Sequence, residues 1–325
     1  MRFFTCCYPT LAACFAAAFW AGCGAQQASA PTTLLLPAAG SAGHLRMAPN
    51  ASSGDLLYVT GDCGGICVFT YPGNKLVQQL SDSNSPFGEC VDEAGDVFVA
   101  DFGGEEGTAA IVEYAHGGTK PIATLSDPGY YPESCSIDPT TGNLAVTNDG
   151  GPIAIYAGAK GDPTYYTDPK AYLNGFCAYD GKGNLFVDGE YVGSGGYALL
   201  EMPKGSITFK SIKLESPPSF WYDIQWAGKY LALADSPTVI YHLAISGTRG
   251  TIIGSTVLNG PVSGIEVQFW IQGGTIIEPY GTGDLPNEIG FWKYPTGGKL
   301  RKKIDGSQFG NAELFGTVVS PGKSR

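Results

Sequence analysis

One short unit recurs six times along this chain, and no other feature of the sequence restricts its fold as strongly. Each copy opens on a glycine at the end of a turn and continues into a short β-prone run, as in Gly95-Asp-Val-Phe-Val-Ala and Gly183-Asn-Leu-Phe-Val-Asp. The six glycines, Gly54, Gly95, Gly142, Gly183, Gly228 and Gly274, are separated by 41, 47, 41, 45 and 46 residues. Repeats of this length are typical of propeller blades.

A second marker follows each glycine after 14 to 20 residues. It is an apolar run that reaches a large residue and then a glycine-containing turn, at Tyr71, Tyr114, Tyr156, Met202, Leu243 and Tyr294. Two markers in the same order, six times each, indicate six copies of one structural unit.

The runs after several of these glycines are apolar at consecutive positions, for example Val97 to Ala100, Leu144 to Thr147 and Leu231 to Ala234. Strands of this kind are buried on both faces, as they are when each blade lies between two others. The chain also has 47 Gly and 22 Pro and shows no long helical period. We therefore predict an all-β fold, a six-bladed β-propeller with four-stranded antiparallel blades.

The two ends of the repeat region complement each other. The stretch before each later glycine is expected to be an innermost strand, such as Glu89 to Asp92 or Ile265 to Phe269. The first repeat lacks this stretch, and Leu314 to Val319 supplies a surplus one at the other end. We predict that Leu314 to Val319 pairs with Leu56 to Thr60 in a shared blade, which closes the ring without a free edge.

The first residues resemble an export signal. Residues 1–22 have a single charge at Arg2 and an apolar stretch from Leu11 to Trp20, which predicts a secretory signal peptide. The segment Trp20-Ala21-Gly22-Cys23 resembles a bacterial lipobox, although Trp20 stands where an aliphatic residue is usual. Lipidation of Cys23 is the favoured prediction, and cleavage at Ala28-Ser29-Ala30 with free secretion is the alternative. Both place the protein outside the cytoplasm.

The remaining chain divides into a tether and one domain. Residues 23–53 are rich in Ala, Gly, Ser, Pro and Thr and predict a flexible tether, and residues 54–325 form the propeller. With 19 basic and 30 acidic residues and no basic cluster, the chain is not expected to bind nucleic acid. We expect a monomer that contacts a membrane only through its lipid anchor. Its partner would be a protein, a glycan or a small molecule.

The repeat pattern also resembles a known family. An inner strand that ends in Asp, a turn, Gly-Asn-Leu-Phe-Val-Asp and a Tyr-containing third strand are similar to the NHL repeat and to gluconolactonase-like six-bladed propellers. The resemblance extends from Gly54 to Val319. It implies the propeller fold, and for the gluconolactonase-like propellers it implies a divalent metal ion held by Glu, Asn and Asp at the channel mouth.

Cysteines give a further set of expectations. The spacing Cys63-Gly-Gly-Ile-Cys67 within a tight hairpin predicts a disulfide, which export permits. Cys90, Cys135 and Cys177 fall at near-equivalent places on three successive inner strands. We interpret them as small buried thiols at a crowded axis, and the pairing of two of them across neighbouring blades as the alternative.

Residues just before the inner strands converge on one mouth of a propeller channel. In this chain these residues are Glu89, Glu133, Asn174, Asp223, Ser263 and Glu313. Oxygen ligands of this kind suit Ca²⁺. Glu89, Glu133, Asn174 and Glu313 are therefore the candidate metal ligands, and Tyr172-Leu173-Asn174-Gly175 resembles the Asn-Gly step of gluconolactonase-like enzymes. The competing interpretation is that these groups only hydrate the channel, and no cofactor is firmly predicted.

Aromatic residues cluster in or next to the connecting segments, at Tyr130-Tyr131, Tyr165-Tyr166, Phe220-Trp221-Tyr222 and Phe269-Trp270. Such clusters suit recognition of a glycan or protein, or else pack between blades. The leading functional hypothesis is a non-catalytic binding or scaffolding propeller on a bacterial envelope. The alternative is a Ca²⁺-dependent lactonase or esterase at the channel mouth.

Overall fold

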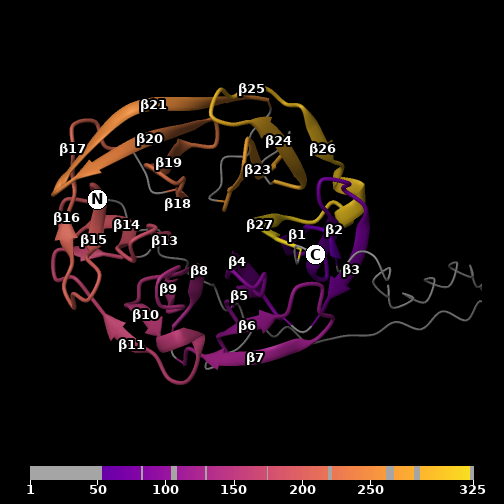
Figure 1. The fold of residues 1–325 in the computed structure, drawn as a ribbon, viewed down its shortest axis with the longest axis horizontal. Helices are drawn as coiled ribbons and strands as arrows, with labels where there is room; N and C mark the ends of the chain where they lie inside the picture. Colours follow the sequence, from indigo (N-terminus) through magenta and orange to yellow (C-terminus); the bar gives the residue numbers. More distant parts are fainter. Residues whose placement is uncertain are drawn as a thin grey trace, which may run out of the picture. The chain divides into compact units, whose positions relative to one another are not determined.

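The computed structural model describes residues 53–81, 83–103, 108–128, 130–173, 175–218, 222–260, 267–281 and 286–322. Six sheets stand around one centre like the blades of a propeller (Figure 1), as predicted. The predicted signal peptide, Cys23 and the predicted tether up to Ser52 lie outside the described residues. No helix in the described ranges is long and apolar enough to cross a membrane.

Blades 1 to 3 each contain four antiparallel strands, ordered from the axis outward. Blade 1 consists of β27 (Leu314–Ser320), β1 (Leu56–Gly61), β2 (Gly65–Thr70) and β3 (Leu76–Leu80). Blade 2 consists of β4 (Pro86–Val91), β5 (Val97–Asp101), β6 (Ala110–Tyr114) and β7 (Pro121–Ser126). Blade 3 consists of β8 (Pro132–Ile137), β9 (Leu144–Asn148), β10 (Ile153–Tyr156) and β11 (Thr164–Tyr166).

Blades 4 to 6 follow the same plan. In blade 4 the innermost strand is in two pieces, β12 (Ala171–Tyr172) and β13 (Cys177–Tyr179), which both pair with β14 (Leu185–Tyr191), followed by β15 (Tyr197–Met202) and β16 (Lys210–Ser211). Blade 5 consists of β18 (Ile224–Trp226), β19 (Leu231–Ser236), β20 (Val239–Ser246) and β21 (Arg249–Asn259). Blade 6 consists of β22 (Trp270–Gln272), β23 (Thr275–Tyr280), β24 (Glu288–Lys293) and β26 (Lys302–Ile304). The 3₁₀ turns that lie wholly within the described ranges are η2 (Ala157–Ala159) and η3 (Gly306–Phe309).

The core is divided into six apolar clusters, one between each pair of neighbouring blades. The cluster between blades 1 and 2 illustrates the principle, because Tyr58 and Val68 of one blade pack against Val99 and Tyr114 of the other. The second strand of a blade is therefore covered on both faces, which is why its apolar residues are consecutive.

The repeated glycines are explained by the turns that follow the inner strands. Gly95, Gly142, Gly183 and Gly228 all have positive φ, between +72° and +86°, a conformation that costs glycine no steric strain. Asp138 and Asp180 hold two of these turns by accepting backbone N–H groups at 2.8 Å.

Blade 6 departs from the predicted pattern. Its inner strand is β22, Trp270–Gln272, because the turn to β23 contains only Gly273 and Gly274. The prediction of Ile265 to Phe269 is wrong for residues 267–269, which are not in a strand, and its first two residues lie outside the described ranges. Gly273 takes the positive φ there. A shorter turn moves the inner strand towards the glycines.

Blade 1 closes the ring as predicted. β27 pairs antiparallel with β1, with Leu57 opposite Val319 and Tyr58 opposite Val318. In Figure 1 the yellow end of the chain accordingly lies beside the indigo beginning of the domain.

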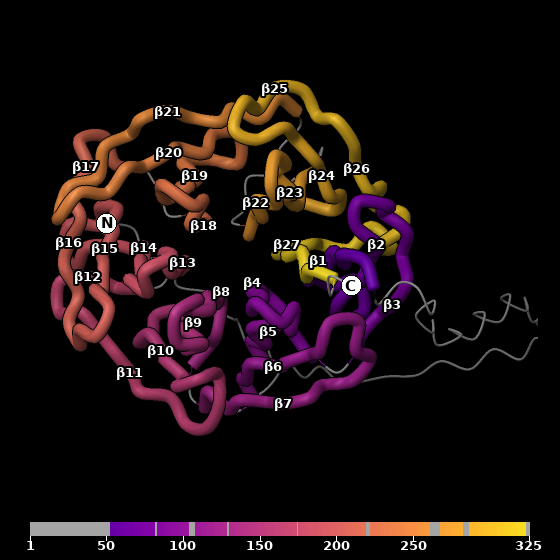
Figure 2. Tube along the Cα trace, viewed as in Figure 1, coloured from indigo at the N-terminus to yellow at the C-terminus, as the bar shows by residue number. Residues whose placement is uncertain are grey.

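Two short parallel pairings join the outer edges of blades 4, 5 and 6 and were not predicted. β17 (Lys213–Leu214) and β25 (Gly298–Lys299) both pair with β21, which has 11 residues. Figure 2 shows this outer belt along β17, β21 and β25. The long β21 offers backbone groups that its own blade leaves unpaired, and the two neighbours use them.

Candidate functional site

The antiparallel blades give the ring two different faces. We call the face at which the inner strands begin the upper face, and the face at which they end the lower face. Along the axis, the inner strands of blades 2 to 6 enclose a cavity of about 150 Å³. Ligand pockets usually measure about 300 to 1,000 Å³, so this channel is too small for a sugar chain or a peptide.

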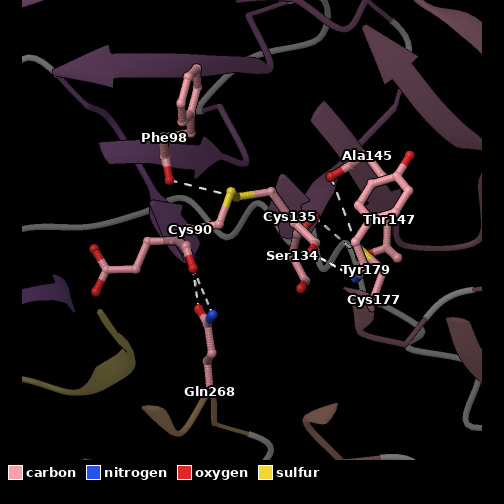
Figure 3. Close-up of a disulfide and its surroundings, with 11 residues drawn as sticks. Cys90, Phe98, Ser134, Cys135, Ala145, Thr147, Cys177, Tyr179 and Gln268 are labelled. Atoms are coloured by element: carbon pink, nitrogen blue, oxygen red, sulfur yellow. Dashed lines mark hydrogen bonds between the residues drawn. A yellow bond between two sulfur atoms is a disulfide. The ribbon is translucent and has the colours of Figure 1, made fainter. Parts of the chain in front are cut away.

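A disulfide between Cys90 and Cys135 joins the inner strands of blades 2 and 3 in the channel wall (Figure 3). The interpretation of all three inner cysteines as free thiols is thus wrong for this pair, and the alternative pairing is confirmed. Cys177 is buried and free, and its thiol donates to the carbonyl of Ala145 at 3.8 Å.

Strand register explains this choice of partners. Cys90 is one residue before the end of its strand, whereas Cys135 and Cys177 are two residues before the end of theirs. Successive side chains on a strand face opposite ways. Cys90 therefore faces the next blade and Cys135 the preceding one, so the two meet. Cys177 also faces the preceding blade, where its thiol meets Ser134 and the carbonyl of Ala145 instead of a second thiol.

The predicted disulfide of the first hairpin is present. Cys63 lies in the turn after β1, Cys67 lies on β2, and the two are bonded. Their Cα atoms are 6.6 Å apart.

A single side chain crosses the channel wall from blade 6 to blade 2. The Gln268 amide donates to the carbonyl of Glu89 at 2.6 Å and accepts the N–H of Glu89 at 2.7 Å. It crosses the inner strand of blade 1 at Gly316, where an added Cβ would lie 3.0 Å from Gln268 Oε1 and 2.8 Å from Thr60 Oγ1. Only glycine allows this close crossing.

Buried carboxyl groups surround the channel. Burial raises the pKa of Glu89 well above its usual range. Burial also raises the pKa of Asp223 well above its usual range, with the nearby charge of Asp188 adding to the effect. The pKa of Glu278 rises to about 8 through burial. These groups favour their protonated forms over much of the neutral pH range.

The structure describes three of the four predicted metal ligands. Glu89 is fully buried on β4, Glu133 is half-buried on β8, and Glu313 lies just before β27 near Asp62. Asn174 and Ser263 lie outside the described residues. Within the described ranges, no three His, Cys, Asp or Glu side chains are grouped to hold a metal ion. These residues do not by themselves form a calcium site, and a site completed by Asn174 stays a prediction.

The upper face carries a row of aromatic rings beside the channel mouth. Phe315 stacks on Phe87 at a centroid distance of 4.9 Å, Phe87 lies 6.5 Å from Phe102, and Phe102 stacks on Tyr131 at 4.8 Å. We call these four residues the aromatic row. Tyr131 is 47% exposed, and the other three are half-buried.

The row is held in place by a buried carboxylate. Asp101, at the end of β5, accepts the N–H groups of Asn84 and Ser85 at 2.9 Å and of Gly103 at 3.1 Å. It thereby fixes the loop that leads into Phe87 at the start of β4 and the loop that contains Phe102.

A second aromatic pair extends the same face towards blade 4. Tyr130 and Tyr165 lie with centroids 5.0 Å apart, and the Tyr165 hydroxyl donates to Asp127 at 2.8 Å. Tyr172, which is 54% exposed, belongs to the same face. By contrast, Phe269 is buried, which agrees with the packing alternative. Phe220 and Trp221 are outside the described part of the chain.

Several residues of the site were missed from the sequence. Phe87, Phe102 and Phe315 are single aromatic residues in three different repeats, and nothing in their local sequence marks them as neighbours. Their positions relative to the strands could have identified them, because each lies at the upper end of a strand in blade 1 or blade 2. Gln268 had no such signal.

Comparisons with known proteins support the fold. No family model and no curated protein matches this chain. A chain in the crystal structure of a nidogen–laminin complex has a TM-score of 0.62 at 13% identity, covering 83% of this chain and 99% of that one. A functionally unknown protein from Desulfotomaculum acetoxidans has a TM-score of 0.56 at 10% identity, covering 86% and 90%.

A third similar structure is the Cps50 (Swd1) β-propeller domain of Myceliophteria thermophila, with a TM-score of 0.53 at 10% identity, covering 78% of this chain and 86% of that domain. At these identities the similarity shows the propeller fold alone. Membership of the NHL-repeat or gluconolactonase-like families stays a prediction.

Proposed function

We propose that this chain is an exported binding propeller that takes a protein partner on its upper face, at the aromatic row. The observation that carries the proposal is the series of ring contacts from Phe315 to Tyr131, which spans the inner strands of three blades and remains accessible at Tyr131. Aromatic side chains of this kind are enriched where proteins bind one another, and they contribute most of the binding free energy.

Charge beside the row suggests what the partner offers. Glu313 and Asp62 lie near each other close to Phe315, and the charge of Asp62 adds to burial in raising the pKa of Glu313. Glu133 follows Tyr131 by two residues. An apolar centre with an acidic margin is complementary to a surface that combines apolar and basic side chains.

The location of the protein is part of the proposal. Two disulfides are compatible with an oxidising compartment. A lipid on Cys23 would hold the domain at a membrane through the tether of residues 23–53. In a bacterial host, we expect the full chain in the membrane fraction and Cys23→Ser in the soluble fraction. Equal distribution of both proteins would instead support free secretion.

Binding can be tested with a phage-displayed peptide library selected on the disulfide-intact domain. We expect enrichment of peptides with basic and apolar residues. The change Tyr131→Ala should lower the affinity for these peptides by about 10-fold or more, because truncating an interface anchor costs about 2 kcal/mol of binding free energy. Tyr131→Phe should retain binding within about three-fold, since it keeps the ring.

Ile207→Ala is the matched control, because Ile207 is 75% exposed but lies in a lower-face turn. Peptides that bind Tyr131→Ala as tightly as the original protein would contradict the proposal, as would a failure to enrich any peptide. The alternative of a calcium-dependent lactonase receives no support from the described residues.

A further inference from the structure

A cavity on the lower face lies between blades 4 and 5. It has a volume of about 730 Å³, within the usual range for ligand sites. Its walls come from the turn Asp180 to Asn184 after β13, from Gly228 and Lys229 after β18, and from the hairpin ends at Pro203 and Thr248. We call this cavity the lower groove. It is separate from the aromatic row, which lies on the opposite face.

The lower groove has a fixed aromatic floor. Trp226 lies parallel to Phe186, with an interplanar angle of 4° and a centroid distance of 5.8 Å. Phe186 is buried in the apolar cluster between blades 4 and 5, and Trp226 is partly exposed and packed against that cluster. The indole is therefore held in one orientation before any ligand arrives, which reduces the entropy cost of stacking a ring on it.

Three lysines and two carboxylates line the lower groove, a formal excess of one positive charge in a chain with 19 basic and 30 acidic residues. Lys182, Lys210 and Lys229 are exposed and line the cavity. Asp180 also lines it, but its carboxylate accepts the N–H groups of Lys182 and Asn184 and the Asn184 amide, all at 2.8 Å. An excess of ammonium groups around one cavity favours an anionic ligand.

The remaining polar groups suit hydroxyl groups on the ligand. Glu201 lines the cavity beside Lys210, whose charge lowers the pKa of this carboxyl against the larger effect of burial. Thr248 adds a hydroxyl on the opposite wall. A carboxylate and a hydroxyl can both accept hydrogen bonds from sugar hydroxyls.

We propose that the lower groove binds an acidic saccharide, a short glycan whose sugar rings carry carboxylates. One ring stacks on the exposed side of Trp226, and the carboxylates lie among Lys182, Lys210 and Lys229. An aromatic platform with a cationic rim recognises the apolar face and the charge of such a sugar together. The inference goes beyond protein binding at the aromatic row and does not depend on it.

The experiment uses trisaccharides of galacturonate, glucuronate and mannuronate, with their methyl esters as uncharged controls. Binding to the disulfide-intact domain is measured by titration calorimetry and by tryptophan fluorescence. At least one acid form should bind about 10-fold more tightly than its ester, and its affinity should fall as salt rises, because charge is screened. The proposal is overturned if no acid form binds, or if the esters bind equally well.

Variants locate the binding to the groove. Lys210→Met and Lys229→Met should each lower the affinity for the acid saccharide by about three-fold or more. Lys299→Met is the matched control, since Lys299 is exposed but lies on β25, away from the groove. Tyr131→Ala should leave saccharide binding unchanged, which separates this site from the aromatic row. Equal losses of saccharide affinity in Lys299→Met and Lys210→Met would contradict the assignment of binding to the lower groove.

Discussion

At the scale of single residues, the channel is organised by side chains that bond to the backbone of another blade. Gln268 bonds both backbone groups of Glu89, and Gln225 accepts the Ile271 N–H at 2.6 Å. Asp223 accepts the Phe269 N–H at 3.0 Å. Inner strands are too far apart to form one sheet around the axis, so these side chains satisfy backbone groups that would otherwise be buried without partners.

We expect Gln268→Ala to destabilise the protein by about 2 to 4 kcal/mol, because it leaves a buried N–H and a buried carbonyl of Glu89 unpaired. Chemical denaturation of the disulfide-intact domain measures this. Gln308→Ala, at an exposed position, is the control and should change stability by less than about 0.5 kcal/mol. Similar losses of unfolding free energy in the two variants would show that the hydrogen bonds of Gln268 contribute nothing to stability.

The buried carboxyl groups predict that stability falls as pH rises. The pKa of Glu278 is about 8 in the folded chain and 4.5 in the unfolded reference. Between these values the folded state holds a proton that the unfolded state has released, so unfolding becomes easier as pH increases through this window. The pKa values of Glu89 and Asp223 are raised in the same direction.

The test compares the protein with Glu278→Gln at pH 4.5 and pH 8.5. The variant should lose less stability between the two pH values, by more than about 1 kcal/mol, because the amide does not titrate. Urea denaturation at constant ionic strength gives both values. Glu93→Gln, at an exposed site, should keep the original pH dependence. If Glu278→Gln lost more stability between the two pH values than the original protein, the predicted effect of the buried Glu278 carboxyl would be contradicted.

At the scale of elements, local spacing predicts contacts within a hairpin and misses those between blades. Cys63 and Cys67 were predicted to pair because the turn between them is short. The bond between Cys90 and Cys135 depends on the opposite orientations of two side chains in neighbouring sheets. The sequence held the necessary signal in the distance of each cysteine from the end of its strand, but the strand ends had to be known to within one residue.

The two disulfides should differ in what they contribute to stability. Cys90 and Cys135 are 45 residues apart, and Cys63 and Cys67 are 4 apart. Breaking a disulfide that closes a larger loop gives the unfolded chain more conformational entropy. For the bond between Cys90 and Cys135, the loop-closure relation gives a loss of about 4 kcal/mol in the free energy of unfolding. We expect C90A/C135A to be destabilised more than C63A/C67A in guanidinium denaturation. The opposite order would contradict this explanation.

At the scale of the whole molecule, the ring depends on a blade assembled from both ends of the domain. β27 covers β1, whose residues are all buried, and the Gly322 N–H bonds Asp55 at 2.9 Å beyond the strands. Without β27, β1 would present an unpaired edge and an apolar face to solvent. Six blades therefore form one cooperative unit more readily than a series of independent repeats.

This predicts unequal effects of two truncations. A chain that ends at Glu313 lacks β27 and should lose its cooperative thermal transition and aggregate. A chain that ends at Gly322 keeps β27 and should melt within about 2 °C of the full chain. Circular dichroism and size-exclusion chromatography distinguish these results. A cooperative transition in the shorter chain would show that closure is not required.

The sequence by itself determined the blade count, the all-β class, the closure and the first disulfide. These follow from periodicity and from contacts between residues close to one another in a repeat, which a linear pattern records. Only the tertiary structure decided the pairing of Cys90 with Cys135, the crossing of Gln268 over Gly316, the aromatic row and the lower groove. Each of these joins different blades, and their geometry depends on how neighbouring sheets face each other around the axis, which no local spacing specifies.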